Sequence, residues 1–206
     1  MFFVLALTAL ASPVDKQIVS PAEPLHQSAE YVRLSRELHE LCALNAWQGV
    51  ERVFLKIEAT GITPTYEVLI AGAHAARAMG DTARSRMRLQ QALMLREAPE
   101  LVEWIQDIDN RYGSVFIACK DTRKRAVFEI SELPFRPMLR RSIEHAQEAI
   151  ASDCYFDGLL PEGAYTLTLP DGWSTTLRVV PKAASLNIDL RTTKNRSSKA
   201  KPKRSR

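Results

Sequence analysis

Apolar residues recur every three to four positions through the first half of the chain, which is the spacing of amphipathic helices. The pattern starts near residue 29 and predicts two consecutive helices. The stripe of the first helix is Tyr31, Leu34, Leu38 and Leu41, and that of the second is Trp47, Val50, Phe54 and Ile57. Gly61 follows the second stripe and is suited to end that helix as a C-cap. Each helix is therefore expected to bury one face.

The same arrangement of two helices then occurs a second time. Pro64 begins a third helix, Gly80-Asp81 interrupts the pattern, and Asp81 or Thr82 can cap a fourth helix. An offset of 35 residues aligns the two units, pairing Tyr31 with Tyr66, Leu34 with Leu69, His39 with His74, and Phe54 with Leu89. A fifth stripe from Leu101 to Tyr112 ends at Gly113 and predicts a capping helix. Such a period indicates an array of helical repeats.

After Gly113 the apolar spacing changes to two, the period of β-strands. The predicted strands are 114–119, 125–131, 165–169, 174–180 and 185–190, and a helix is predicted over 136–152. Turns are predicted at Pro161-Glu162-Gly163, Pro170-Asp171-Gly172 and Pro181-Lys182. The expected fold class is therefore α+β. Antiparallel helix-pair repeats occupy residues 28–113, and a small β-sandwich with one inserted helix occupies residues 114–191.

The second helix pair resembles a tetratricopeptide repeat. Gly72 and Ala73 stand where two helices must approach closely, Gly80-Asp81 is the turn, and Ala92-Leu93 matches the small-large pair near the end of the unit. The resemblance covers residues 29–98 and implies a concave face that binds a protein or peptide partner. The candidate partner-binding residues are Arg33, Glu37, His39, Glu67 and His74. A solvated face without a partner is the alternative for each of them.

Residues 158–190 resemble the PEGA family of small β-sandwich modules, which occur in bacterial and archaeal surface proteins. The resemblance rests on Gly158, on the run from Leu160 to Tyr165, on Gly172-Trp173, and on the strand from Ile188 to Leu190. It implies that a proline-glycine turn feeds a strand that carries the chain across the sandwich. The helix over 136–152 stands where the family has a short connection.

The first twelve residues form an apolar run that ends in small residues. Ala9 and Ala11 have the spacing that signal peptidase accepts. The run is shorter than the roughly 20 residues of a transmembrane helix. We therefore predict a signal peptide over 1–12 and a proline-containing linker over 13–27, with an uncleaved anchor or an apolar strand as alternatives. Export would place the protein in the periplasm or cell envelope.

The three cysteines, Cys42, Cys119 and Cys154, follow no metal-ligand spacing. In an exported chain, one disulfide and one remaining thiol is the simplest arrangement. Cys119 and Cys154 are the favoured pair because both lie in the C-terminal half. Three separate buried thiols are the alternative.

Positive charge is concentrated at the C-terminus. The chain has a net charge of +4, and residues 192–206 hold seven Lys or Arg and no acid, so the rest of the chain carries −3. Such a segment predicts a disordered tail that binds an anionic envelope polymer or membrane, or less favourably nucleic acid. The candidate residues for binding an anionic surface are Lys194, Arg196, Lys199, Lys201, Lys203, Arg204 and Arg206. A solubilising tail without a partner is the alternative.

No combination of residues indicates catalysis, a cofactor or a metal. The four histidines are scattered, and no nucleophile elbow, phosphate loop or dinucleotide fingerprint occurs. His145 and Glu148 lie one helical turn apart, and we interpret them as a surface contact. Asp107, Asp109 and Asn110 lack the other ligands of a calcium loop.

Taken as a whole, the sequence predicts a non-catalytic exported scaffold that binds a protein or peptide through helical repeats. The alternative is an intracellular adaptor that associates with nucleic acid through its basic tail. Two repeats are fewer than the roughly three that such arrays usually need, so the ends of the array require cover. The C-terminal domain and a second copy of the chain, in a homo-oligomer, are the candidates.

Overall fold

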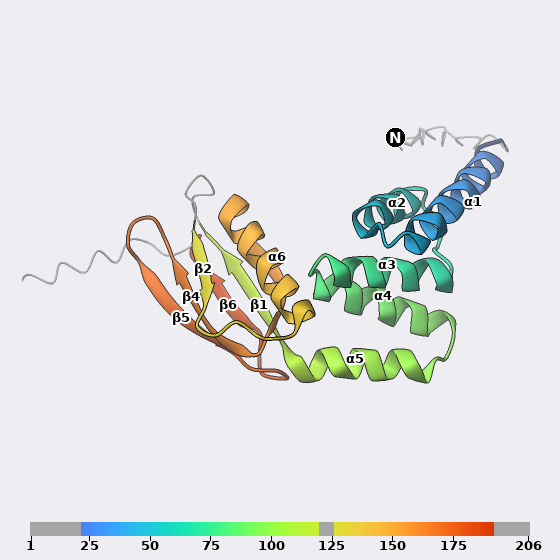
Figure 1. The fold of residues 1–206 in the computed structure, drawn as a ribbon. Coiled ribbons are helices and arrows are strands. Elements are labelled where there is room, and N and C mark those ends of the chain that lie inside the picture. Colours follow the sequence, from blue (N-terminus) through green and yellow to red (C-terminus); the bar gives the residue numbers. More distant parts are fainter. Residues whose placement is uncertain (1–21, 120–125, 192–206) are drawn as a thin grey trace, which may run out of the picture.

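The computed structural model describes residues 22–119 and 126–191, with side chains described from residue 28 onward. These residues form a mixed α+β fold with six helices and two three-stranded sheets. Figure 1 shows five helices stacked on one side of the molecule and the strands on the other, with the sixth helix between them. The predicted class, helices followed by strands, is confirmed. The predicted signal peptide and basic tail lie outside the described residues.

The five N-terminal helices follow one another along the stack, and each packs against the next. They are α1 (Ala22–Ala43), α2 (Trp47–Ala59), α3 (Tyr66–Ala78), α4 (Thr82–Leu95) and α5 (Pro99–Arg111). Asp81 caps α4, because its Oδ1 accepts a hydrogen bond from the N–H of Arg84 at 2.9 Å. The first turns of α1 fall within the segment expected to be a linker. Pro24 does not prevent this, since proline is tolerated in the first turn of a helix.

Small residues allow α2 and α3 to approach closely. A Cβ atom on Gly72 would lie 2.4 Å from the ring of Phe54, which is shorter than any van der Waals contact. Ala73, Ala75 and Ala76 of the same helix are buried. The predicted close approach is therefore confirmed at Gly72, where α3 meets α2.

A buried ion pair joins α2 to α4. The guanidinium of Arg88, which is 1% exposed, donates hydrogen bonds to both carboxylate oxygens of Glu51, at 2.5 and 2.8 Å. It also donates to the carbonyl oxygen of Gly72 at 2.7 Å, and it lies 3.8 Å from the ring centre of Phe54. Arg84 adds a second guanidinium on Glu51 at 3.2 Å. Three helices thus meet at this buried ion pair, a contact that the sequence analysis did not predict.

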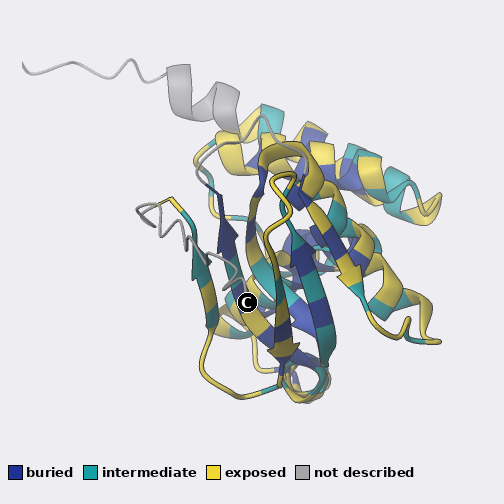
Figure 2. Ribbon diagram, turned by 90° about the vertical axis from the view of Figure 1, so that its left-hand side faces the viewer, coloured by how far each residue is buried: buried dark blue, intermediate teal, exposed yellow. Residues whose placement is uncertain are grey.

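The strands form two sheets. The first has the order β3-β1-β6, with β1 (Tyr112–Ala118) antiparallel to β3 (Tyr155–Pro161) and parallel to β6 (Leu186–Asp189). The second has the order β2-β4-β5 and is antiparallel throughout, formed by β2 (Val127–Ile130), β4 (Gly163–Thr168) and β5 (Ser174–Val179). Buried and exposed residues alternate along several strands, as Figure 2 shows, because each sheet buries one face.

Helix α6 (Pro137–Asp153) packs on β2 and β3, the edge strands of the two sheets, and so closes one side of the sandwich. Its Ile143, Ala146 and Ile150 are buried in the core that the two sheets share. The chain passes from one sheet to the other at Glu162, between β3 and β4. Strand β3 was not predicted, because Asp157 and Gly158 interrupt its apolar residues and Pro161 was interpreted only as part of a turn.

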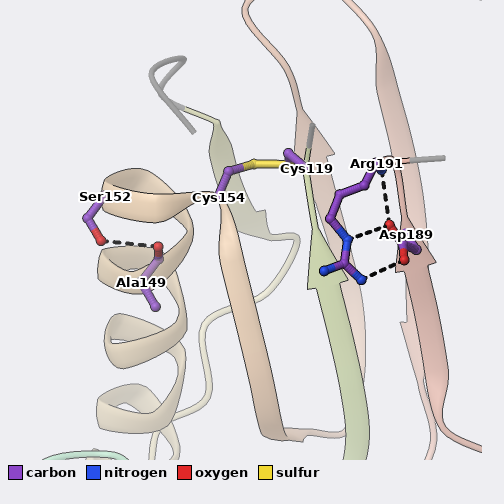
Figure 3. Close-up of a disulfide and its surroundings, with 6 residues drawn as sticks. All are labelled: Cys119, Ala149, Ser152, Cys154, Asp189 and Arg191. Carbon is purple, nitrogen blue, oxygen red and sulfur yellow. Dashed lines mark hydrogen bonds and ion pairs between the residues drawn. A yellow bond between two sulfur atoms is a disulfide. The ribbon is translucent and has the colours of Figure 1, made fainter. Parts of the chain in front are cut away.

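A disulfide joins Cys119 to Cys154, which confirms the predicted pair. Figure 3 shows the bond linking the end of β1 to the residue before β3. The N–H of Cys119 also donates to the carbonyl oxygen of Cys154 at 3.0 Å. The same figure shows Arg191 bound to Asp189 just after β6, which lowers the pKa of Asp189 to about 2 through that hydrogen bond. Cys42 is a free thiol and is partly buried.

The two regions are in direct contact through α6 and the turn between α3 and α4. The hydroxyls of Thr82 and Ser142 share a buried hydrogen bond of 2.8 Å. Gly80 has a φ of 88° in that turn, and a Cβ there would lie 2.2 Å from the carbonyl oxygen of Arg141. None of the helices described is long and apolar enough to cross a membrane.

Candidate functional site

The most distinctive surface of the helical region is an aromatic cluster formed by Trp47, His74 and Trp104, with Arg77 beside it. The imidazole of His74 lies between the indoles. Its centroid is 6.4 Å from that of Trp47, with an interplanar angle of 28°, and 4.7 Å from that of Trp104, with an angle of 45°. The guanidinium carbon of Arg77 lies 5.0 Å from the Trp104 ring centre. Three helices, α2, α3 and α5, thus contribute to one surface.

Helical spacing and small neighbours explain why these side chains meet. Arg77 follows His74 by three residues, so both side chains project from the same face of α3. The other residues of that helix are largely alanine and glycine, as in the run from Ala71 to Ala78. Because α3 presents little bulk, the tryptophans of the neighbouring helices reach across it. Trp47 and Trp104 are half-buried against the core, and His74 is more exposed than either of them but still partly covered.

The environment of His74 favours the neutral imidazole. Partial burial lowers its pKa, and the positive charge of Arg77 lowers it further. A neutral imidazole offers one hydrogen-bond donor and one acceptor. The indole Nε1–H of Trp104 is buried and has no hydrogen-bond partner among the described residues. The cluster therefore combines aromatic surface with the donor and acceptor of the imidazole and one cation.

Such a surface suits an apolar or proline side chain of a peptide. Indole rings supply large contact areas at small cost in conformational entropy, and aromatic-lined grooves bind extended proline-rich segments. Arg77 and the imidazole would supply polar contacts to the peptide backbone at the edge of the rings. The chemistry of the cluster is therefore compatible with contact to a short extended segment.

Of the five residues predicted to bind a partner, the structure places His74 in this cluster. The other four make contacts elsewhere. Arg33 forms ion pairs with Glu30 at 2.7 Å and with Glu37 at 3.3 Å along α1, and its hydrogen bond to Glu30 raises its pKa. The Nδ1 of His39 lies 2.6 Å from the carbonyl oxygen of Ser35 in the preceding turn.

Glu67 lies beside a different cation. Its Oε1 is 3.8 Å from Nη1 of Arg96, and the guanidinium carbon of Arg96 lies 3.5 Å from the ring centre of Tyr66. That contact joins the start of α3 to the end of α4. Glu67 therefore has a contact between neighbouring helices and does not belong to the aromatic cluster.

Trp47, Trp104 and Arg77 belong to the cluster but were not predicted as site residues. Both tryptophans lie on apolar stripes and were assigned to the core, whereas each leaves part of its ring exposed. The available signal was a histidine on an alanine-rich helix, since a polar ring surrounded by small residues leaves room for large neighbours. Which neighbours fill that room depends on helix packing, which the sequence does not specify.

The other residues considered for chemistry have structural contacts. Asp107 binds Arg111 at 2.6 Å, and Asp109 binds Arg86 at 2.6 Å. The Nε2 of His145 lies 4.0 Å from Asp81. Within the described residues there is no group of three or more His, Cys, Asp or Glu side chains that would hold a metal ion. The seven basic residues of the predicted tail lie outside the part of the chain that the structure describes.

Comparison with known protein families, with curated proteins and with solved structures found no match.

Proposed function

We propose that this protein is a non-catalytic scaffold of the cell envelope that binds a protein or peptide partner through tetratricopeptide-like helix pairs. The observation that carries the proposal is the aromatic cluster of Trp47, His74 and Trp104, to which the helices α2, α3 and α5 contribute. A surface made from several helices suits an extended partner better than a small molecule, because it is broad and open.

The repeat interpretation is supported by how the two helix pairs correspond. Tyr31 and Tyr66 occupy matching places at an offset of 35 residues. The hydroxyl of Tyr31 accepts a hydrogen bond of 2.9 Å from the N–H of Thr65, the residue that caps α3. The first pair thereby contacts the start of the second. In this interpretation α5 covers one end of the helical array, and the β-sandwich covers a further part of the array's surface.

The envelope location is supported by the disulfide between Cys119 and Cys154. Disulfides form and persist in oxidising compartments and are rare in the cytosol. The apolar start of the chain and the PEGA-like turn and strands agree with that location. In this proposal the β-sandwich positions the helical region at the envelope, and the basic tail holds an anionic surface.

The binding proposal is tested by selecting peptides from a displayed library of random twelve-residue segments against the full chain. We expect the selected peptides to be rich in proline or apolar residues, and to bind His74→Ala and Trp104→Ala at least about tenfold more weakly than the unmodified protein. Fluorescence anisotropy measures these affinities, and circular dichroism verifies that each variant is folded.

Trp173→Ala is the matched control, since Trp173 is a partly exposed tryptophan on the sandwich. Its removal is expected to leave peptide affinity unchanged. Equal binding by the unmodified protein and by both cluster variants would show that the aromatic cluster is not the binding site.

The location is tested by determining the N-terminal sequence of the protein recovered from fractionated cells of its native source. A mature chain that starts near Ser12 and lies outside the cytoplasm is the expected result. An intact Met1 in the cytoplasmic fraction would contradict export.

A further inference from the structure

A pocket rich in arginine lies where the helical region meets the sandwich. Its volume is about 160 Å³. Arg77 from α3 and Arg111 from the end of α5 line it on the helical side, and Arg136, immediately before α6, lines it on the sandwich side. Tyr112 and Met138 complete much of the wall. The three rings of the aromatic cluster do not line the pocket, although Arg77 contributes to both.

The pocket carries more positive than negative charge. Three guanidiniums line it, and Asp107 is the one carboxylate among the described residues that does so. Asp107 is engaged by Arg111 at 2.6 Å. Arg77 and Arg136 form no ion pair with a carboxylate in the part of the chain that the structure describes. Two positive charges therefore remain in excess, and they give the pocket a positive potential that attracts anions.

The backbone adds to this charge. Helix α6 begins at the pocket with Pro137 in its first turn, and Arg136 provides no side-chain cap. Pro137 has no N–H, and the N–H of Leu139 donates to the carbonyl oxygen of Arg136 at 3.1 Å, so among the first three residues of the helix the N–H of Met138 is the one left for an anion. The N–H groups at a helix N-terminus carry partial positive charge and favour anions. This contribution is secondary, because the three arginines define the site.

We propose that this pocket binds a phosphoryl group. Such a group carries about −1.5 to −2 charges at neutral pH and three acceptor oxygens, which matches two excess positive charges and several guanidinium donors. A carboxylate carries one charge, and a single arginine satisfies it with two parallel hydrogen bonds. Arginines that approach from three different elements indicate a ligand with more acceptors than a carboxylate has.

A phosphoryl group bound there would connect the two regions of the protein. Arg77 and Arg111 belong to the helical stack, while Arg136 precedes the helix that closes the sandwich. An anion that contacts all three holds the junction in one arrangement and stabilises the folded chain by its binding free energy. This inference goes beyond the proposed peptide binding and does not depend on it.

Two probes distinguish the sources of the group: inorganic phosphate represents the free anion, and glycerol 3-phosphate represents a phosphoryl group carried on a larger molecule. Calorimetric titration of the full chain is expected to show binding of at least one probe with a Kd below about 1 mM, and a Tm raised by about 2–4 °C near saturation. If only inorganic phosphate binds, the ligand of the pocket is a free phosphate anion. If glycerol 3-phosphate binds, the ligand is a phosphoryl group attached to a larger molecule. Sodium chloride and sodium acetate at the same ionic strength are expected to leave Tm unchanged.

Arg136→Ala tests the site itself, because Arg136 is exposed and its loss leaves the core intact. We expect phosphate or monoester affinity to fall at least about tenfold in this variant, while Arg136→Lys retains part of it. Arg141→Ala is the matched control: it removes the same charge from α6, at a residue paired with Glu144 outside the pocket. The proposal is overturned if neither probe binds, if acetate stabilises as strongly as phosphate, or if Arg136→Ala and Arg141→Ala weaken binding equally.

Discussion

The helical region and the β-sandwich are stabilised in different ways. The helical core contains buried charges, Glu51 and Arg88, together with small residues of α3 that allow close packing. In the described part of the sandwich, the core consists of apolar side chains such as Ile117, Leu160 and Leu167, and a disulfide joins its first sheet. The helical region therefore depends on a buried ion pair in which both partners must be present. The sandwich depends on apolar burial and on a covalent bond.

This difference determines which perturbation each region can withstand. A buried ion pair is strongly destabilising when one partner is lost, because an uncompensated charge remains in the core. A disulfide acts largely through the unfolded state and responds to reductant instead. Although the regions share the junction at Thr82 and Ser142, a change in one is therefore expected to affect that region first.

Replacing Glu51 by alanine is expected to have the largest effect. It leaves the guanidinium of Arg88 buried with one hydrogen bond, to the carbonyl oxygen of Gly72. The expected loss is about 3–5 kcal/mol in the free energy of unfolding. Amide hydrogen exchange, resolved by segment, should become faster in α2, α3 and α4 than in the unmodified protein, with a smaller increase in the strands.

Glu58→Ala is the control for this change, since Glu58 is an exposed carboxylate on the same helix. A double variant, Glu51→Leu with Arg88→Met, should regain much of the stability, because apolar residues often replace a buried ion pair without loss. If Glu51→Ala unfolds at the same denaturant concentration as Glu58→Ala, the ion pair does not hold the helices together.

Removing the disulfide is expected to have the next largest effect. The double variant Cys119→Ala with Cys154→Ala opens a loop whose two ends are 35 positions apart in the sequence. About 2–4 kcal/mol of stability should be lost, with exchange rising first in β1 and β3. Denaturant unfolding with and without a thiol reductant measures this loss.

Cys42→Ala serves as the reference variant, because Cys42 is a free thiol on the helical side. Reductant should lower the unfolding midpoint of the unmodified protein and of Cys42→Ala, and should leave the double variant unchanged. An equal response to reductant in the helices and in the strands would mean that the two regions unfold as one unit, and the contrast between them would then be lost.

Local signals account for what the sequence predicted. The apolar stripes and the cap at Asp81 depend on neighbours within a few residues, and so do the turns near Gly61 and Gly172. The disulfide was predictable because few cysteines were available to pair. Strand β3 was missed because its alternation is broken by Asp157 and Gly158, and its burial comes from α6 and from pairing with β1.

The candidate sites depend on contacts between distant residues, which no short pattern encodes. In the sequence, nothing distinguishes Glu51 and Arg88 from other charged helix residues. Helix packing brings them together although they are 37 positions apart. The arginines of the pocket at the junction, Arg77, Arg111 and Arg136, come from three segments on both sides of that junction. His74 was identified from its repeat position, but its tryptophan neighbours were not, because their partners are set by the stacking of α2, α3 and α5.

The smallest expected effect concerns pH and sharpens the comparison within the helical region. Partial burial and Arg77 lower the pKa of His74 below the usual 6.5, so the folded protein resists protonation at a pH where the unfolded chain accepts a proton. The unfolded state then binds more protons, and stability falls as pH drops from about 6.5 through the lowered pKa. From about one pH unit above 6.5 both states are neutral and the contribution is complete.

His74→Gln removes this group, and its free energy of unfolding should depend less on pH between about 7.5 and 5 than that of the unmodified protein. The difference should be a fraction of a kcal/mol, because the imidazole is partly exposed and water screens it. His39→Gln is a close control, since His39 lies at the matching position of the first helix pair and is bound to a backbone carbonyl in solvent. Denaturant titrations across this pH range measure both variants.

If His39→Gln changes the pH dependence of stability as much as His74→Gln does, the tryptophans and Arg77 do not set the charge of His74. The surroundings of His74 would then affect its protonation no more than the exposed face of α1 affects that of His39.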